Sequence, residues 1–428
     1  MKQRFTASGR SKRYTVGFAA VAAATLALSG CGSGGTSDTP AEDSEPASGE
    51  AAAPAGEVVL EVWDYLGQGV SDTAMQSVVA EFEAENPDIK IKRTSFAYSD
   101  LATAIVQGGV GGSVPDVAIV DVVDTQNFAS LGLLKDITDV AGDRADEFFD
   151  GPWQSTQVDG KTFGMPLNSN NLALYYNVDK FDAAGLDVPT NWDELSETAT
   201  ALSTDGEYGF TMSGVKNEQG TFQFLPFLWQ TGGDLDTFAT DGATALDFLK
   251  SLIDEGAMST SVANYSQEDA RTQFVNGKSA MMMNGPWELQ NLQEAGINYG
   301  VAPLPAGVVA ATGLGGENVV AFAEAAQPDA AVKFLEFITG TDGAMLYCNE
   351  SGQLSSRVDL QGKLKLSDDP DMLVFENQLD VAHARAYGLN YNEISAAVQE
   401  ALQKVLTGAA TPDEAATSAA DVITPLLP

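Results

Sequence analysis

The chain has 428 residues, and its 60 acidic residues outnumber 22 basic residues to give a formal net charge of −38 at pH 7. A surface this acidic repels phosphate backbones and anionic headgroups, which excludes nucleic acid as a partner and disfavours polyanionic ligands, and its simplest role is solubility. Apolar residues make up 44% of the chain, enough for sizeable cores, and the length is that of two domains.

Residues 1–30 have the pattern of an export signal. Basic residues, among them Lys2 and Arg13, precede an apolar run over residues 16–28 that is shorter than the roughly 20 residues of a membrane span. The tetrapeptide that ends at Cys31 resembles the lipobox of bacterial lipoproteins. That resemblance implies cleavage before Cys31, a lipid on its thiol, and a protein held at the extracellular face of the cell membrane, or in the periplasm where an outer membrane is present. The alternative is an ordinary secretory signal, which also exports the protein.

Residues 31–56 follow as a stretch of Gly, Ser, Thr, Pro, Ala, Asp and Glu without large apolar side chains. Such a segment cannot bury enough surface to order itself, so we expect a disordered tether. Cys348 is then the single remaining cysteine, and we expect it to be a small buried residue.

Strands and helices alternate from residue 58 onward. Residues 58–63, 89–92 and 115–121 have the β-branched runs of strands. Met75, Val78, Val79 and Phe82 mark one face of a helix that starts near residue 71, and a second helix over residues 99–107 is broken by the glycines of 108–112. Strand, helix, strand, helix, strand within about 65 residues predicts an α/β sheet with parallel strands.

Further elements follow the same pattern. Residues 172–176 are strand-like, and Thr190 with Asp193 predicts a capping box before a helix. Late helices are indicated over residues 328–340 and 391–408, and Thr411, Pro412 and Glu414 open a last one.

Motifs for the common hydrolase and nucleotide chemistries are absent from the sequence. His383 is the one histidine, and HExxH, CxxC and GxSxG do not occur. The segment at 277–279 lacks the earlier glycine of a P-loop, and 313–316 lacks the third glycine of a dinucleotide fingerprint. We therefore expect no catalytic residue, metal or cofactor, although a two-carboxylate glycosidase stays open because acidic pairs are numerous.

Aromatic and polar residues next to each other indicate a binding site instead. Trp63 ends the first strand, Asp121 ends the third, and both positions suit a ligand at the carboxyl ends of strands. Trp229 is followed by Gln230 and a turn-rich loop, and Trp287 follows Asn284. Flat apolar faces beside amides and carboxylates suit sugar rings and their hydroxyls. For Asp121, the alternative role is a helix cap or a solvated turn. For Trp192 and Trp153, packing is the expected role.

Ordered motifs resemble those of the family 1 extracellular solute-binding proteins, the carbohydrate-binding lipoproteins of ABC importers. In chain order they are FEAENPDI at 82–89, PDV at 115–117 with GLL at 132–134, DGKTFGMP at 159–166, YYN at 175–177, AGL at 184–186, TNWDEL at 190–195, FVNGKSAM at 274–281, GPW at 285–287 and VAPLP at 301–305. Each motif alone is weak, but their order and spacing carry the resemblance over nearly the whole chain from residue 58.

The resemblance implies a two-lobe, type II periplasmic-binding-protein-like α/β fold with a hinge. It places lobe 1 at 57–167 and 299–345, and lobe 2 at 168–298 and 346–428. By position in the family, the implied ligand contacts are Trp63, Asp121, Asn170, Trp229, Asn284, Trp287, Glu317 and Arg357, with Asn168 and Asn171 as further amides. Glu317 would lie in a loop that faces the cleft, and Ser355 replaces the family's proline before Arg357.

Three functions remain. The first is capture of a carbohydrate, preferably an oligosaccharide, by a monomer that delivers it to the permease subunits of an ABC importer. The second is the same fold with a glycerophosphodiester, polyamine or peptide. A phosphate would need basic residues in the cleft, for which Arg357, Lys216 and Arg271 are the candidates. The third is an exported glycoside hydrolase.

Overall fold

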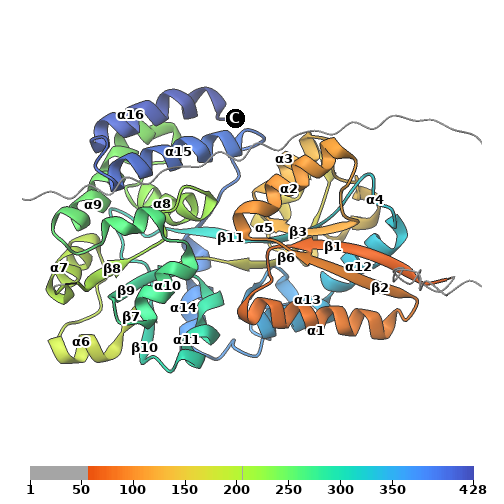
Figure 1. The fold of residues 1–428 in the computed structure, drawn as a ribbon, viewed down its shortest axis with the longest axis horizontal. Coiled ribbons are helices and arrows are strands. Elements are labelled where there is room, and N and C mark those ends of the chain that lie inside the picture. The colour runs from red at the N-terminus through yellow and green to blue at the C-terminus, as the bar shows by residue number, and fades with distance from the viewer. Residues whose placement is uncertain (1–55, 205) are drawn as a thin grey trace, which may run out of the picture. The chain divides into compact units, whose positions relative to one another are not determined.

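The computed structural model describes residues 56–204 and 206–428 (Figure 1). The predicted signal peptide, the lipidation site at Cys31 and the tether up to residue 55 lie outside the described residues. Within the described ranges, none of the helices combines the length and the apolar character that a membrane crossing requires.

A seven-stranded sheet organises the first lobe. Its strands run in the order β12-β6-β11-β3-β1-β2, and β13 pairs with the free part of β11. The strands are β1 (Val58–Asp64), β2 (Ile89–Ser95), β3 (Val117–Asp121), β6 (Met165–Asn170), β11 (Thr312–Ala321), β12 (Leu354–Ser355) and β13 (Ala382–Ala384). Strands β1, β2 and β3 are parallel, as predicted, whereas β11 runs antiparallel to β3 and β6.

Helices cover both faces of this sheet. They are α1 (Gly69–Glu85), α2 (Tyr98–Gly111), α3 (Asp124–Ser130), α4 (Thr138–Ala141), η1 (Arg144–Glu147), α5 (Asp150–Ser155), α12 (Pro328–Ile338), α13 (Thr341–Ser351) and η6 (Val358–Leu360), with a small hairpin of β4 (Gln157–Val158) and β5 (Lys161–Thr162). Val117 and Ile119 of β3 point into one apolar cluster, and Ala118 and Val120 point into another. A strand buried on both faces must be apolar throughout, which is why residues 117–120 carry a continuous apolar run.

A four-stranded sheet, ordered β10-β7-β9-β8, organises the second lobe. Its strands are β7 (Ala173–Asn177), β8 (Tyr208–Thr211), β9 (Ser279–Asn284) and β10 (Tyr299–Ala302). The side chains alternate between two clusters: Leu174 and Met281 lie in one, and Tyr175 and Met282 lie in the other.

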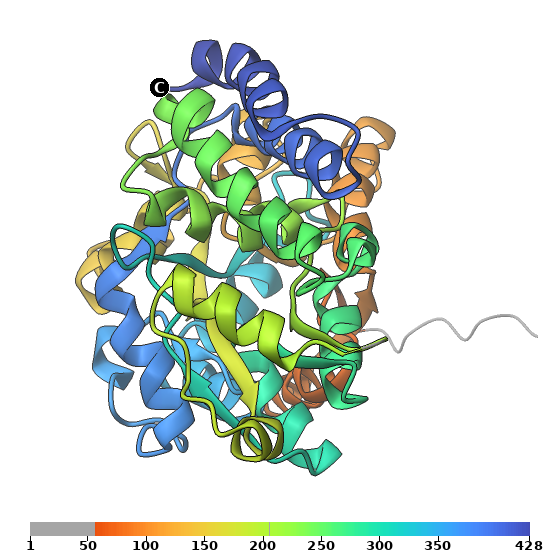
Figure 2. The ribbon, with the colours of Figure 1, turned by 90° about the vertical axis from the view of Figure 1, so that its left-hand side faces the viewer.

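The helices of the second lobe come from two stretches of chain, residues 178–295 and residues 370–426. They are α6 (Val178–Ala184), α7 (Trp192–Leu202), α8 (Glu218–Gln230), η2 (Leu235–Thr237), η3 (Phe238–Gly242), α9 (Ala243–Asp254), η4 (Thr260–Asn264), α10 (Gln267–Val275), η5 (Pro286–Glu288), α11 (Leu289–Ala295), α14 (Pro370–Gln378), η7 (Leu379–Val381), α15 (Tyr391–Leu406), α16 (Pro412–Ile423) and η8 (Thr424–Leu426). The two last long helices, α15 and α16, pack on α8 and α9 at one side of this lobe (Figure 2).

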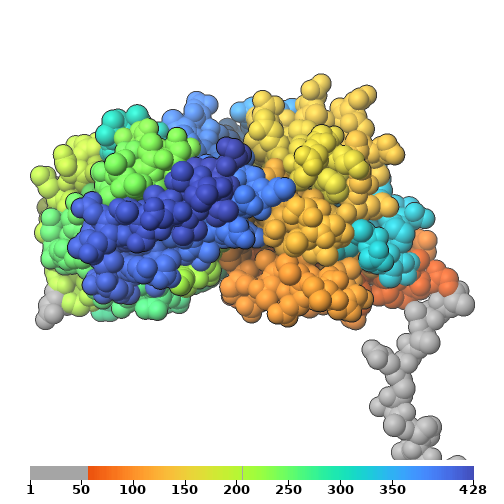
Figure 3. All heavy atoms as spheres, turned by 90° about the horizontal axis from the view of Figure 1, so that it is seen from above, coloured from red at the N-terminus to blue at the C-terminus, as the bar shows by residue number. Residues whose placement is uncertain are grey.

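The chain passes between the lobes after β6, between β10 and β11, and between β12 and α14. Strand β11 runs from the pairing with β13 into the centre of the first sheet (Figure 1). On the face seen in Figure 3, residues of α15 and α16 in dark blue lie beside the orange residues of α2 and α3.

Two segment boundaries differ from those expected. Residues 299–302 belong with the second lobe because β10 pairs with β7. Helix α13 belongs to the first lobe beyond residue 345, since Tyr347 and Cys348 are buried in a first-lobe cluster. Cys348 is the buried thiol that the sequence predicted.

Two helix predictions need correction. Helix α2 continues through Gly108 and Gly109 to Gly111. The glycine at 109 serves packing, since a Cβ there would overlap Leu133. Helix α7 is capped by Asn191, whose side chain accepts the Glu194 amide hydrogen, rather than by Thr190. The capping box of Thr411 and Glu414 is confirmed.

Candidate functional site

A cleft of about 360 Å³ lies between the two lobes, a volume within the range of small-molecule sites. The first lobe contributes the ends of β1 and β3, the middle of β11 and the first turns of α1 and α2. The second lobe contributes the starts of α8 and α10, and η5 with α11. Its lining residues are Tyr65, Leu66, Gln68, Gly69, Val70, Ser71, Phe96, Ala97, Tyr98, Ser99, Asp121, Asn170, Asn217, Gln219, Phe222, Ser266, Gln267, Glu268, Arg271, Trp287, Glu288, Asn291, Gly316, Glu317, Gln353 and Arg385.

Four of the predicted contact residues line this cleft: Asp121, Asn170, Trp287 and Glu317. Glu317 lies inside strand β11 and not in a loop, and it pairs in register with Asp121 of β3. Gly316, which directly precedes Glu317, has an unusual backbone conformation. Its φ is +141°, and a Cβ there would meet the Asn168 carbonyl oxygen. Glycine at 316 thus allows β11 and β6 to approach at the cleft floor.

Asp121 already has partners from the protein. Its Oδ1 accepts the Val123 amide hydrogen at 3.1 Å and a hydrogen of Arg385 Nη2 at 3.1 Å, and its Oδ2 accepts the Tyr98 hydroxyl at 2.9 Å. Asp121 therefore serves the turn after β3, which is one of the two roles that the sequence left open, and it also lines the cleft.

Arg385 joins the two lobes at the floor of the cleft. It lies between β13 and α15 and is 6% exposed. Its guanidinium pairs with Asp121 of the first lobe and with Glu218 at the start of α8, and it lies 4.4 Å from the centre of the Phe222 ring. Glu218 also accepts the Tyr391 hydroxyl at 2.6 Å. The positive charge of Arg385 is thus fully compensated within the protein.

Glu317 keeps one carboxylate oxygen free. Its Oε1 accepts the Tyr65 hydroxyl at 2.8 Å, whereas Oε2 has no hydrogen-bond partner although the residue is 6% exposed. Burial raises the pKa of Glu317 to about 7. Gln353 and Arg385 also line the cleft, and Gln353 Oε1 and Arg385 Nε are enclosed atoms without a hydrogen-bond partner. The floor of the cleft is therefore polar, and its polar groups are not all used by the fold.

The second-lobe wall carries another buried carboxylate. Glu288 pairs with Arg271 Nη1 at 3.0 Å and accepts the Asn291 amide at 2.9 Å. Burial raises the pKa of Glu288 to about 6, against the lowering effect of Arg271. The positive charge of Arg271 is therefore compensated by the carboxylate of Glu288, as that of Arg385 is by Asp121 and Glu218.

Aromatic rings line both walls: Tyr65, Phe96 and Tyr98 in the first lobe, and Phe222 and Trp287 in the second. Tyr65 meets the ring of Tyr98 edge-on at 4.9 Å. Phe96 packs against Trp63, and Phe222 lies under the Arg385 guanidinium. These contacts fix the rings, which form apolar surfaces beside the polar floor.

The ring of Trp287 lies directly over Gly285. A Cβ at Gly285 would come within 2.0–2.5 Å of three atoms of the indole ring. We expect Gly285→Ala to displace the indole and weaken ligand binding about tenfold, a cost of about 1.4 kcal/mol. Because the φ of Gly285 is −103°, alanine is compatible with the backbone. Circular dichroism should therefore show an unchanged fold while titration calorimetry shows the weaker binding; equal affinities of the two proteins would mean that the position of the indole is unimportant.

Three other predicted contacts lie outside the cleft lining. Trp63 packs against Phe96 with ring centres 5.0 Å apart, within the first-lobe core. Trp229 belongs to helix α8, is 2% exposed, and donates to Asp234 Oδ1 at 3.1 Å. Asn284 is completely buried in β9 and donates to the Gln267 carbonyl oxygen at 3.1 Å. In this structure they pack and support the cleft wall, and their roles as ligand contacts stay predictions.

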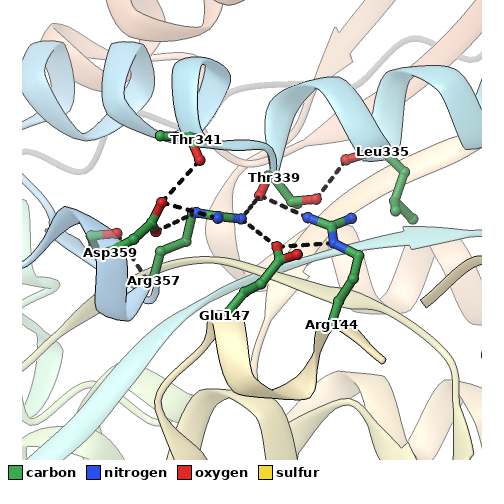
Figure 4. Close-up of polar contacts among 8 residues, drawn as sticks. Arg144, Glu147, Leu335, Thr339, Thr341, Arg357 and Asp359 are labelled. Carbon is green, nitrogen blue, oxygen red and sulfur yellow. Dashed lines mark hydrogen bonds and ion pairs between the residues drawn. The ribbon is translucent and has the colours of Figure 1, made fainter. Parts of the chain in front are cut away.

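Arg357 is also a structural residue. It pairs with Glu147 at 2.9 Å and Asp359 at 2.9 Å, and donates to the Thr339 carbonyl oxygen at 3.0 Å (Figure 4). These contacts tie the segment after β12 to η1 and to the end of α12. Arg357 does not line this cleft, so its predicted ligand contact stays a prediction that the structure does not support. Asn171 donates to the Phe375 carbonyl oxygen and is likewise used by the fold.

Packing is the role found for Trp192 and Trp153, as predicted. Trp192 stacks on Phe248 with ring centres 4.3 Å apart, and Trp153 stacks on Phe148 at 5.7 Å.

Several cleft residues were not predicted. Arg385 is the most consequential, followed by Tyr65, Phe222 and Gln353. Tyr65 lies two residues after Trp63, directly beyond the strand whose carboxyl end was expected to face the ligand, so this position could have been found. The other three come from elements whose places at the cleft depend on pairing and packing distant in sequence.

Known proteins resemble this chain along most of its length. Residues 67–345 match the family model for "Bacterial extracellular solute-binding protein". Putative binding proteins of Brucella abortus are 28% identical over 376 residues, with 84% of this chain and 91% of theirs covered. The maltodextrin-binding protein MdxE of Bacillus subtilis is 25% identical over 310 residues, with 68% and 72% covered. The sn-glycerol-3-phosphate-binding protein UgpB of Escherichia coli is 27% identical over 399 residues, with 83% and 89% covered.

Solved structures show the same fold. The GacH receptor of Streptomyces glaucescens, known unliganded and with acarbose, matches with a TM-score of 0.79 at 26% identity over 87% of this chain and 98% of its own. A solute-binding protein of Thermotoga lettingae bound to α-D-tagatose matches with a TM-score of 0.80 at 27% identity over 87% and 100%. The fold is the two-lobe type II fold of periplasmic binding proteins. The chain therefore belongs to the bacterial extracellular solute-binding protein family, and it is a binding protein and not an enzyme.

Proposed function

We propose that this protein captures a sugar, preferably an oligosaccharide, in the cleft between its lobes and delivers it to the permease of an ABC importer. The observation that carries the proposal is the cleft lining, where the carboxylates, amides and guanidinium groups of Asp121, Glu317, Gln353 and Arg385 lie among aromatic rings. A hydroxyl group both donates and accepts a hydrogen bond, so it matches these groups, while the C–H faces of a sugar ring match the aromatic surfaces.

Five aromatic side chains on two walls offer more stacking surface than one sugar ring covers, which favours an oligosaccharide. MdxE is a maltodextrin-binding protein, GacH is known in complex with acarbose, and the Thermotoga lettingae protein is bound to α-D-tagatose, which supports this ligand class.

A glycerophosphate ligand is the second candidate, because UgpB is similar over most of the chain. The charges of the cleft disfavour it. Arg271 and Arg385 both line the cleft, but each is paired with buried carboxylates. Lys216, a third basic candidate, pairs with Glu400 away from the cleft. Moving an anion next to Glu317, Glu288 and Asp121 without a free cation would cost free energy.

The proposed transport cycle uses both lobes. Because the ligand would touch both walls of the cleft, its binding favours the closed arrangement about the connecting segments over an open one. We propose that the closed, loaded monomer is the form that the permease recognises, and that a lipid on Cys31 keeps it at the extracellular membrane surface.

Thermal unfolding of the purified protein against a ligand panel tests the proposal. The panel is maltose, maltotriose, mannotriose, D-tagatose, spermidine, sn-glycerol 3-phosphate and glycerophosphocholine. A ligand at 100 times its Kd should stabilise the native state by about 2.7 kcal/mol. We expect the largest increase in Tm with a sugar; an increase only with spermidine or a phosphate compound would contradict the proposal.

A further inference from the structure

We propose that Asp64 and Arg93 are positioning residues for ligand binding, because they clamp together the two loops that carry the aromatic wall of the first lobe. This inference rests on the proposed function, since it concerns how the same cleft holds its ligand. The clamp consists of Asp64, Arg93, Ser95 and Asp72, and none of these four residues lines the cleft. The clamp therefore sets the affinity without a contact to the ligand.

The two loops begin where two neighbouring parallel strands end. Strand β1 ends at Asp64 and β2 ends at Ser95, and these two residues are partners in the register of the sheet. The residues that follow line the cleft: Tyr65 and Leu66 after β1, and residues 96–99 after β2. A group that ties the two strand ends together therefore fixes the separation of the two loops at the edge of the sheet where a ligand binds.

Asp64 is the centre of the clamp and is 0% exposed. Its Oδ1 accepts the Leu66 amide hydrogen at 2.9 Å and the Ser95 hydroxyl at 2.7 Å. The same oxygen accepts a hydrogen of Arg93 Nη2 at 3.0 Å, and Oδ2 accepts one from Arg93 Nε. The backbone carbonyl oxygen of Asp64 accepts the Phe96 amide hydrogen at 2.8 Å. One residue thus holds the first loop through Leu66 and the second loop through Ser95 and Phe96.

Arg93 extends the clamp to helix α1. Its Nε and Nη2 form a fork on the Asp64 carboxylate, and its Nη1 pairs with Asp72 in the first turn of α1. The Arg93 side chain is 15% exposed, so these charge-assisted hydrogen bonds are largely shielded from water. The same turn of α1 lines the cleft through residues 69–71. Lysine has no planar fork, so it cannot replace arginine between two carboxylates.

The aromatic wall of the first lobe depends on these loops. Tyr65 is the first residue of one loop, and its ring meets that of Tyr98 edge-on at 4.9 Å. Phe96 is the first residue of the other loop, and its ring centre lies 5.0 Å from that of Trp63. A tie at the base of the loops therefore sets how the rings of Tyr65, Phe96 and Tyr98 stand relative to one another, and so how well a sugar ring fits against them.

Gly67 shows how closely the two loops approach. A Cβ at Gly67 would come within 2.4 Å of Ser95 Oγ and 2.7 Å of Ser95 Cβ. Glycine at 67 thus allows the first loop to lie on the second. The φ of Gly67 is not positive, so alanine there would disturb the approach of the loops and not the backbone conformation.

Arg93→Lys tests the clamp, because it keeps the positive charge and removes the fork. In the ligand-free protein, hydrogen exchange followed by mass spectrometry should be faster than in the wild type in peptides that cover residues 65–71 and 96–99. The Kd of the probe, measured by titration calorimetry, should rise about tenfold. The probe is maltotriose, or the panel compound with the largest increase in Tm if maltotriose gives none.

Glu83→Gln is the matched control, since it weakens a tie between the same helix and strand at their other end. Glu83 of α1 accepts the Ile91 amide hydrogen at 2.8 Å and pairs with Lys90 at 3.0 Å. This variant should keep the wild-type Kd and the wild-type exchange of residues 65–71 and 96–99. A residue with a merely structural role would lower Tm in the same way as Glu83→Gln does and leave the Kd unchanged.

Gly67→Ala is a second test that keeps every side chain of the clamp, and it decides the question if Arg93→Lys does not fold. Its Kd should rise about three- to tenfold. Its control is Gly111→Ala at the end of α2, where φ is not positive and a Cβ would meet nothing within 4 Å, and this variant should bind like the wild type.

The outcomes separate this inference from the proposed function. A wild-type Kd in folded Arg93→Lys or in Gly67→Ala, unchanged exchange of the two loops in Arg93→Lys, or equal losses of affinity in Arg93→Lys and Glu83→Gln would overturn the inference. If the probe proves to be spermidine or a phosphate compound, the proposed function is contradicted, and the comparison of Kd values still decides whether the clamp positions the cleft wall.

Discussion

Replacing Arg385 with methionine is expected to lower the free energy of unfolding by about 3–5 kcal/mol. The side chain of Arg385 is 1% exposed and pairs with Asp121 and Glu218, which come from different lobes. Methionine fills a similar volume but leaves two buried carboxylates without their cation, and removing one partner of a buried ion pair is far more costly than the pair is stabilising. Urea unfolding monitored by circular dichroism measures the loss.

Lys216→Met is the control for this experiment. Lys216 also forms an ion pair between distant segments, with Glu400, but its side chain is 55% exposed. Exposed pairs contribute about 0–1 kcal/mol, so this variant should unfold at nearly the wild-type urea concentration. Equal losses in the two variants would show that burial of the Arg385 network is not what makes it important.

Trp287→Ala is expected to weaken sugar binding about thirtyfold, a loss of about 2 kcal/mol. Trp287 is half-buried on the second-lobe wall of the cleft, where its indole is the largest aromatic surface among the lining residues. Its removal takes away the apolar face on which a sugar ring would stack, and it leaves the polar floor intact. Titration calorimetry with the sugar that gives the largest increase in Tm measures the change in Kd.

Trp153→Ala is the matched control, since Trp153 is half-buried as well but stacks on Phe148 away from the cleft. It should lower Tm while leaving the Kd unchanged. A loss of affinity as large for Trp153→Ala as for Trp287→Ala would indicate a general loosening of the fold and not a contact with the ligand.

Local pattern predicted the first half of the first-lobe sheet well. Strands β1, β2 and β3 are continuous in sequence with the helices that join them, and their apolar runs are those of strands inside a parallel sheet. Strand β11 could not be found in this way. It is rich in glycine at 313–316, and its place in the sheet is fixed by antiparallel pairing with β3 and β6, each more than a hundred residues away.

The same limit applies to the site. Asp121 and Trp287 were identified because a strand end and a short aromatic motif are visible locally, and both line the cleft. Trp229 was expected from its neighbour Gln230 and the following loop, and Arg357 from family position, but in this chain Asp234, Glu147 and Asp359 bind their polar atoms. Arg385 carries no local signal, because its importance comes from carboxylates at 121 and 218 that only the fold brings together.

The central claim is that a sugar binds in the cleft between the aromatic walls. A crystal structure of the protein with maltotriose, or with the panel sugar that gives the largest increase in Tm, tests it most directly. We predict a sugar ring against the indole of Trp287 and sugar hydroxyl groups within hydrogen-bond distance, about 3.0 Å, of polar side chains that line the cleft. A sugar bound outside this cleft, or one that does not contact Trp287, would contradict the account.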